Sequence, residues 1–340
     1  MSPSAVATPR MGLPPVVVEQ AGRLVAGSGG RARLAGHEPL KKSVHRLRFE
    51  AAGGRTSVVV KRLSPRRARA NLLVAERWLP AAGLEQACPG LWGVVRDAAA
   101  RWHVYEDVPG SGLDEGVPDP ERVGPVVELI VELHTRFAGH PLLVECRELA
   151  EELGIGFYSV KVARSVGLLE SIRAEGPQQA LRDRLLRRLE RLHRERDERA
   201  ALLETFGGEE TLLHGDLWTT NTLVGAGSNG LEARLIDWDH VGVGPVTYDL
   251  STFLYRFPSP VRPWILGLYR EAAARRGWSL PDNPTLNALF ETAEYARYAC
   301  CLADAALAAS EGKHWGFAQM AEIERWFSKL ERARLVDGGR

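Results

Sequence analysis

The pattern of hydrophobic and polar positions changes about a third of the way along the chain. Residues 31–63 predict strands, because "SVHRLRFE" alternates apolar and polar residues and "TSVVV" is β-branched; Gly53 and Gly54 form the turn of a hairpin. The stretch 65–80 has the spacing of a helix, which its last residue, a proline, ends. A second extended stretch, "RWHVYEDV", ends at Pro109. These elements predict a small lobe that mixes helix and strand.

From about residue 119 the spacing of apolar positions becomes helical, and only residues 211–237 interrupt the helices with strand-like segments. We therefore predict an α+β fold with two lobes: a small mixed N-lobe with an antiparallel sheet (residues 1–108, of which about the first twelve are disordered) and a larger, mainly helical C-lobe (residues 109–340). The basic stretch "LRDRLLRRLERLHRERDERA" places its leucines on one helical face and mixes acids with its arginines. This pattern favours a solvated amphipathic helix over a nucleic-acid-binding one.

Composition narrows the class of protein. The chain has 340 residues, 45% of them hydrophobic and 26% charged, as in an ordinary globular protein, and its formal net charge is +1. This charge gives no reason to expect a nucleic-acid or membrane partner. The 4 cysteines have neither metal-site nor disulfide spacing, and no segment resembles a signal peptide or a membrane span. We therefore expect a cytoplasmic protein that acts as a monomer or a homodimer.

Candidate chemistry gathers at the strand-like segments of the second half. In "LLHGDLWTTNTLV", Asp216 and Asn221 lie on a short loop between two apolar runs, which predict buried strands that hold the loop rigidly. Asp237 follows the apolar pair of a later segment, "LIDWDH". Carboxylate and amide oxygens in small number suit Mg²⁺, which completes its coordination shell with water and phosphate oxygens. These residues therefore predict a magnesium site and a phosphorylated ligand.

The two segments resemble those of a known family. "HGDLWTTN" keeps the spacing of the kinase catalytic loop, and "IDWD" stands where a protein kinase has its metal-binding aspartate. With glycine after the histidine, the chain is similar to the aminoglycoside phosphotransferase and choline kinase family. This family is a small-molecule branch of the protein-kinase-like fold. The resemblance implies that the N-lobe binds nucleotide and that the C-lobe carries the catalytic loop and the substrate-binding helices.

In the N-lobe the resemblance implies a lysine that contacts the nucleotide phosphates and a helix glutamate that holds it. Lys61, at the end of the β-branched run, and Glu76, on the following helix, fill these positions. The adenine contacts would be backbone groups of Glu106 and Val108, with Tyr105 preceding them as a gate. The glycine-rich phosphate loop departs from the kinase pattern, and Lys42 or Ser43 would contact phosphate in its place.

In the C-lobe the resemblance implies that Asp216 is catalytic and accepts or orients the proton of the acceptor hydroxyl, while Asn221 and Asp237 are metal ligands. His214 would brace the loop, and Asp249 would tie it down by backbone hydrogen bonds or simply cap a helix. The alternative for the loop residues is ordinary turn capping. His134 is better explained as a core-edge histidine, and Trp218 and Trp238 either stack on a substrate or pack in the core.

The expected activity is that of a kinase that uses ATP, with GTP as the alternative, together with Mg²⁺. Its acceptor would be a hydroxyl group of a small molecule, such as an antibiotic, an amino alcohol or a sugar-like metabolite. Acids and bases are nearly balanced over residues 281–340, which does not favour a pocket for a polycation. Two alternatives remain: a catalytically inactive kinase-like module that binds nucleotide, and a protein kinase, which the absence of an APE-like segment after Asp237 disfavours.

Overall fold

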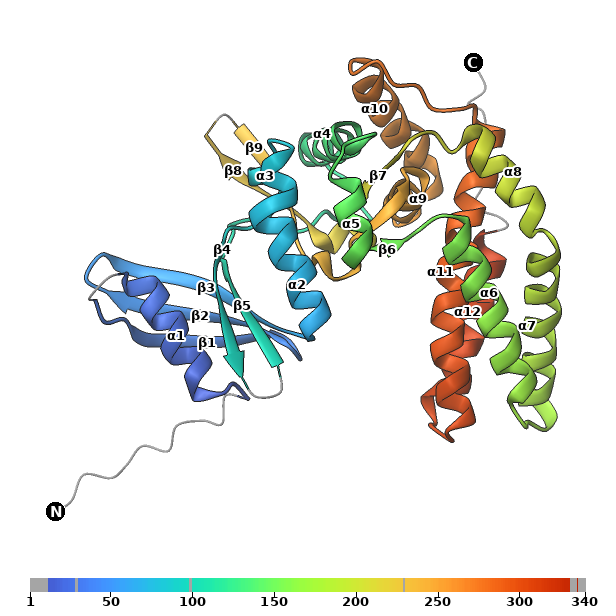
Figure 1. Ribbon diagram of the computed structural model, residues 1–340, viewed down its shortest axis with the longest axis horizontal. Coiled ribbons are helices and arrows are strands. Elements are labelled where there is room, and N and C mark those ends of the chain that lie inside the picture. The colour runs from blue at the N-terminus through green and yellow to red at the C-terminus, as the bar shows by residue number, and fades with distance from the viewer. Residues whose placement is uncertain (1–11, 28–29, 98–99, 229, 331–334, 336–340) are drawn as a thin grey trace. The chain divides into compact units, whose positions relative to one another are not determined.

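The computed structural model describes residues 12–27, 30–97, 100–228, 230–330 and 335 (Figure 1). The predicted disordered tail falls mostly on residues 1–11, which lie outside the described residues. The described chain forms two compact units. The first runs to Gly110 and includes Arg234–Asp239; the second comprises Ser111–Ala233 and the residues from His240 onward. The segment Arg234–Asp239, which the sequence analysis assigns to the C-lobe, thus belongs with the first unit.

The first unit is built on an antiparallel sheet with strand order β1-β2-β3-β5-β4 (Figure 1). Its strands are β1 (Arg33–Lys41), β2 (Val44–Ala51), β3 (Gly54–Leu63), β4 (Leu91–Asp97) and β5 (Ala100–Glu106). Helix α1 (Pro15–Ala26) buries Val17 and Ala21 in one core with Phe49 and Val60 of the sheet. Because side chains alternate across a strand, the apolar positions of β2 and β3 share the face that meets this helix.

The turn between β2 and β3 lies one residue earlier than predicted. Ala51 pairs with Gly54, so the two turn residues are Ala52 and Gly53. Gly54 is the first residue of β3, and its φ of 110° is a value that glycine adopts readily because it has no Cβ.

The helix after β3 continues past the proline that is predicted to end it. Helix α2 (Pro65–Leu73) passes into a π-helical turn (η1, Val74–Trp78) and then into α3 (Leu79–Ala81), which contains Pro80. In the π turn the N–H of Leu79 bonds to the carbonyl of Val74. This shift in hydrogen bonding accommodates a residue that has no N–H to donate. A short 3₁₀ turn (η2, Glu85–Ala87) leads to β4.

The second unit is mainly helical, as predicted. Its helices are α4 (Pro120–Phe137), α5 (Leu143–Leu149), α6 (Ile155–Ser171), α7 (Gly176–Arg194), α8 (Arg196–Phe206), α9 (Thr247–Leu254), α10 (Arg262–Ala274), α11 (Asn283–Ser310) and α12 (Trp315–Leu330). No helix in the described ranges is long and apolar enough to cross a membrane. The predicted basic helix is divided at Glu195 into α7 and α8.

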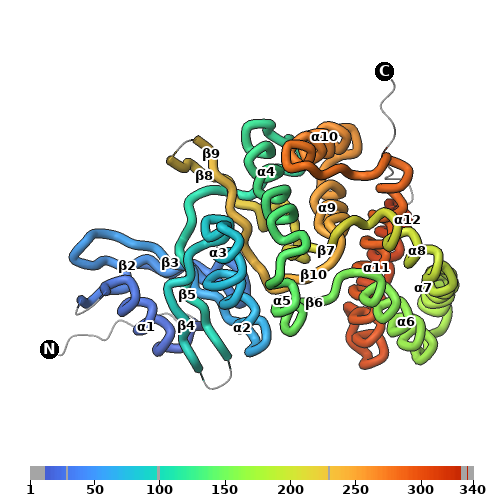
Figure 2. Tube along the Cα trace, turned by 45° about the horizontal axis from the view of Figure 1, so that its top comes forward, coloured from blue at the N-terminus to red at the C-terminus, as the bar shows by residue number. Residues whose placement is uncertain are grey.

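Helices α6, α7, α11 and α12 lie side by side in both views and share one hydrophobic core (Figures 1 and 2). The leucines of the basic helix are buried in it: Leu181, Leu185, Leu189 and Leu192. Tyr295 and Tyr298 of α11 belong to the same core. The apolar face of the basic helix is therefore occupied by protein, and Arg188 lies at the edge of this face with its guanidinium over the Phe327 ring.

Short strands carry the two polar segments. Strand β10 (Gly242–Pro245) pairs antiparallel with β7 (Glu210–Leu213) and parallel with β6 (Glu151–Glu152). Strands β8 (Thr222–Gly227) and β9 (Gly230–Leu235) form a hairpin. Two 3₁₀ turns follow the polar residues, η3 (Thr219–Asn221) and η4 (Trp238–His240). The loop with Asp216 therefore lies between two strands, of which β7 is mostly buried, as predicted, whereas β8 is buried only at Thr222 and Val224.

Candidate active site

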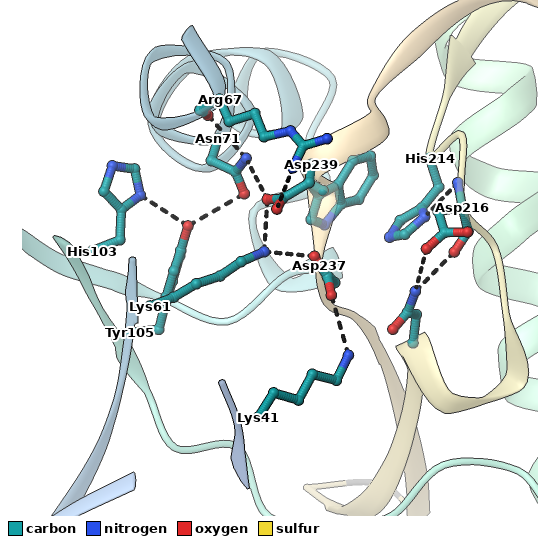
Figure 3. Close-up of polar contacts among 12 residues, drawn as sticks. Lys41, Lys61, Arg67, Asn71, His103, Tyr105, His214, Asp216, Asp237 and Asp239 are labelled. Carbon is teal, nitrogen blue, oxygen red and sulfur yellow. Dashed lines mark hydrogen bonds and ion pairs between the residues drawn. The ribbon is translucent and has the colours of Figure 1, made fainter. Parts of the chain in front are cut away.

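Lys61 is the centre of the polar cluster in the first unit (Figure 3). It lies near the end of β3, and its side chain is only 10% exposed. Its Nζ donates to Asp237 Oδ1 at 2.5 Å and to Asp239 Oδ1 at 2.6 Å. Two carboxylates therefore hold the lysine in place, which restricts a side chain that is otherwise flexible.

Asp237 occupies an unusual position for a residue other than glycine. Its φ of 69° lies in the left-handed region, where strain persists only if the surrounding structure enforces it. Burial acts to raise the pKa of Asp237, but the charge and hydrogen bond of Lys61, with a smaller effect from Lys41, hold it below its ordinary value. Asp237 is therefore a carboxylate at neutral pH.

A chain of hydrogen bonds supports the second carboxylate (Figure 3). Asn71, on α2, donates from Nδ2 to Asp239 Oδ1 at 3.2 Å. The Tyr105 hydroxyl donates to Asn71 Oδ1 at 3.4 Å and lies 2.9 Å from His103 Nδ1. Burial, with a further effect from the charge of Lys61, lowers the pKa of His103 to about 4. His103 is therefore neutral, and its Nδ1 is hydrogen-bonded to the Tyr105 hydroxyl.

Glu76, the helix glutamate predicted to hold Lys61, lies outside this cluster. It is exposed on the π-helical turn, and the carboxylates bonded to Lys61 are those of Asp237 and Asp239. The helix residue that reaches the cluster is Asn71. A position five residues further along a helix is rotated by about 140°, so a helix that directs Asn71 inward directs Glu76 away.

The positions predicted to contact nucleotide lie at two other places in the first unit. Lys42 and Ser43 form the turn between β1 and β2, and the neighbouring Lys41 has its Nζ 3.4 Å from Asp237 Oδ2. At the end of β5, the N–H of Glu106 donates to the carbonyl of Gly90. The N–H of Val108 makes no hydrogen bond to any residue that the structure describes. It therefore remains available to a ligand.

In the second unit the structure brings Asp216 and Asn221 together. Asn221 is buried, and its Nδ2 donates to the Asp216 carbonyl at 2.9 Å and to Asp216 Oδ2 at 3.2 Å. The N–H of Asp216 donates to His214 Nδ1 at 3.3 Å (Figure 3). The Asp216 side chain is half-buried, so its carboxylate is both fixed in orientation and accessible.

Asp249 binds the backbone of the same loop from α9. Its Oδ2 accepts from the His214 N–H at 2.7 Å, and its Oδ1 accepts from the Gly215 N–H at 2.9 Å. Burial acts to raise the pKa of Asp249, but the hydrogen bond and charge of His134 hold it below its ordinary value. His134 is fully buried, and its Nδ1 lies 2.9 Å from the Tyr269 hydroxyl. His134 is thus a core residue that supports the loop through Asp249.

Gly215 is the tightest point of this loop. Its φ is 79°, and a Cβ at this position would overlap the backbone oxygen of His240.

Of the two tryptophans near the polar segments, Trp238 is buried and donates to the Leu235 carbonyl, whereas Trp218 is 37% exposed. Only Trp218 is therefore open to a ligand. Within the described ranges, no three His, Cys, Asp or Glu side chains gather as a metal site.

Comparisons with known proteins bear on the family and the fold. A family model, described as the phosphotransferase enzyme family, matches residues 37–282. No curated protein matches the chain by sequence. A solved spectinomycin phosphotransferase, in complex with ADP and spectinomycin, has a TM-score of 0.57 and 14% identity, covering 89% of this chain and 92% of its own.

Two further solved structures are similar over most of their length. An ethanolamine kinase from Plasmodium vivax has a TM-score of 0.57 and 11% identity, covering 87% of this chain and 83% of its own. A GDP complex of aminoglycoside 2'-phosphotransferase-IIIa has a TM-score of 0.56 and 13% identity, covering 86% of this chain and 93% of its own. At these identities the likeness concerns the fold. The predicted protein-kinase-like fold is confirmed.

Proposed function

The chain belongs to the phosphotransferase enzyme family, and from this premise we propose that it uses ATP and Mg²⁺ to phosphorylate a hydroxyl group of a small molecule. The proposal places this reaction in the cytoplasm. The acceptor class includes antibiotics, amino alcohols and sugar-like metabolites. GTP is the alternative phosphate donor.

The observation that carries the proposal is the geometry of the loop between β7 and β8. Asn221 fixes one oxygen of the Asp216 carboxylate, while Asp249 fixes the backbone just before it. In the proposed reaction, Asp216 accepts the proton of the acceptor hydroxyl. The hydroxyl oxygen then forms a bond to the terminal phosphorus of ATP, and the bond from that phosphorus to ADP breaks. Such a base needs a fixed direction, because phosphoryl transfer depends mainly on positioning.

The first unit supplies the groups proposed to bind the nucleotide. Asp237 and Asp239 fix the orientation of Lys61, and its ammonium group is the proposed cationic contact of the nucleotide phosphates. The unpaired N–H of Val108 and the backbone of Glu106 are the proposed contacts for the base. Glu76 has no role in this proposal, because Asp239 and Asn71 take the place of a helix glutamate.

The residues predicted as metal ligands fit magnesium by their chemistry. Both side-chain hydrogen bonds of Asn221 use its Nδ2, and its Oδ1 makes none to the residues that the structure describes. Asp237 is a carboxylate with a depressed pKa. As the resemblance implies, we propose Asn221 Oδ1 and the Asp237 oxygens as ligands of the ion, which when bound would neutralise charge on the transferred phosphate.

We predict that purified protein releases ADP from ATP only when both Mg²⁺ and a suitable alcohol are present. The measurement is ADP release in a coupled assay, screened over hydroxylated antibiotics, amino alcohols and sugars. If nucleotide binds but no alcohol raises ADP release above background, the chain is the inactive kinase-like module instead.

We expect the Lys61→Met variant to lose roughly 100- to 1,000-fold in kcat/KM for ATP, because a preorganised charge at the transferred phosphoryl group is removed. Initial rates at varied ATP concentration measure this effect. Lys313→Met, at an exposed lysine, is the matched control and should keep the wild-type value. Similar rates in both variants would assign Lys61 a structural role only.

A further inference from the structure

An arginine stacks on the exposed tryptophan of the loop. Trp218 is the second residue after Asp216, and its N–H donates to the Asp216 carbonyl at 2.8 Å. Since consecutive Cα atoms are 3.8 Å apart, the Cα atoms of these two residues lie within about 7 Å of one another. The guanidinium carbon of Arg256 lies 4.0 Å from the centroid of the Trp218 ring. The cation therefore stacks on a ring that belongs to the same loop as the residue proposed to activate the acceptor.

Arg256 has no partner for its charge in the described part of the chain. No hydrogen bond or ion pair involves its side chain, and its Nε is buried without an acceptor. A buried donor without an acceptor is costly unless a ligand satisfies it. Two other arginines of the unit, whose side chains are largely buried, are paired: Arg297 with Glu294, and Arg199 with Glu195. Arg256 differs from them in offering a free guanidinium.

The fold fixes Arg256 and the loop through one helix. Asp249, near the start of α9, accepts the two N–H groups that precede Asp216. Arg256 follows the end of the same helix in a continued turn, in which its N–H donates to the Phe253 carbonyl at 3.3 Å. The backbone of Arg256 is therefore tied to the loop through α9, and stacking on Trp218 is the contact that holds its guanidinium.

Ionisable groups of both signs surround Arg256, among them the cation Arg262 and, beside Trp218, the carboxylate of Glu115, which accepts from the Thr219 hydroxyl at 2.6 Å. Burial is the main cause that lowers the pKa of the nearby Arg262, and the charge of Arg256 lowers it further. Tyr298 is the other ionisable group that Arg256 influences, and burial raises its pKa, so it is neutral. Glu294, which also acts on the pKa of Tyr298, is bound through Oε1 by Arg297 and Ser251, while its Oε2 is buried without a partner among the described residues.

We propose that Arg256, stacked on Trp218, binds a carboxylate or phosphate group of the acceptor. The acceptor is then a hydroxyl compound that carries an oxyanion, and a polycationic alcohol is disfavoured. A guanidinium presents paired donors that match such oxyanions, and its own charge repels cationic acceptors. This inference rests on the proposed function, because it identifies the substrate class of the same site.

Matched acceptor pairs that differ only in charge test the proposal. The probes are 4-hydroxybutyrate with its primary amide, glycerate with glyceramide, and homoserine with its amide, alongside a polyamino sugar. We expect kcat/KM, from ADP release, to favour the acids roughly 10- to 100-fold in the wild type. Arg256→Gln should reduce this preference to near one, mainly by raising KM for the acids, and Arg256→Lys should restore part of it. Arg196→Gln, at an exposed arginine, is the control and should keep the preference.

The outcomes separate this inference from the proposed function. If the amides or the polyamino sugar are preferred, or if Arg256→Gln leaves the preference unchanged, the oxyanion site is excluded while the kinase activity stands. If no probe is phosphorylated, the proposed function fails for these acceptors. Binding of the same pairs, measured by saturation-transfer NMR, then decides the site. Acid-selective binding that Arg256→Gln abolishes supports it, whereas equal or absent binding overturns it.

Discussion

Replacing Asp216 by asparagine is expected to lower kcat for phosphoryl transfer roughly 100- to 10,000-fold, the usual contribution of a positioned general base. The substitution keeps the size of the side chain and removes its capacity to accept the hydroxyl proton. The effect should appear in kcat rather than in KM for ATP, because Asp216 is proposed to contact the acceptor. Initial rates of ADP release at saturating ATP and acceptor measure it.

The control for this experiment is Asp197→Asn, at a carboxylate that is 90% exposed and pairs only with Arg196 among the described residues. It should retain the wild-type kcat. Equal nucleotide affinity in the Asp216→Asn variant would show that its fold is intact. A variant that keeps most of the wild-type kcat would exclude Asp216 as the base and leave it as a turn-capping residue.

Asp249→Ala is expected to destabilise the second unit by about 1–3 kcal/mol for each of the two backbone N–H groups that lose their acceptor. Both belong to the loop before Asp216, at His214 and Gly215, and both are buried. The loop should therefore lose order together with stability. Urea unfolding monitored by circular dichroism measures the change as a lower midpoint.

The depressed pKa of Asp249 gives this effect a pH dependence of known sign. A carboxyl group whose folded-state pKa lies below its ordinary value, about 4, contributes fully above that value. The contribution is lost as the pH falls through the folded-state pKa. The wild type and Asp249→Ala should thus differ most near neutral pH and converge in acid. A difference that stayed constant down to acid pH would show that the charge of Asp249 is not what stabilises the loop.

Much of the fold and part of the site follow from local sequence. The predicted family is confirmed, and with it the predicted enzyme class of phosphotransferase. The sequence alone places Asp216 and Asn221 close together, because they are five residues apart on one tight loop between two strands. Lys61 could also be identified from local sequence, because the β-branched residues before it predict its strand.

The rest depends on contacts between segments far apart in the chain. Asn71 and Asp239 meet across 168 positions, and no local signal favours Asn71 over Glu76, because a π-helical turn alters the helix register. The stacking of Arg256 on Trp218 has no signature in either segment. Helix α1 and strand β4 were also missed, because short apolar runs do not distinguish helix from strand.

The crowding at Gly215 limits how this enzyme can diversify. No side chain fits at Gly215, and Asp249 binds the backbone at this position. Substitutions in the first half of the loop should therefore be eliminated by selection. Trp218 and Thr220 are exposed, and a change at Trp218 would alter the stacking of Arg256 rather than the backbone of the loop. New acceptor preferences in descendants of this chain should therefore arise at those two exposed positions, with the phosphate-transferring residues left untouched.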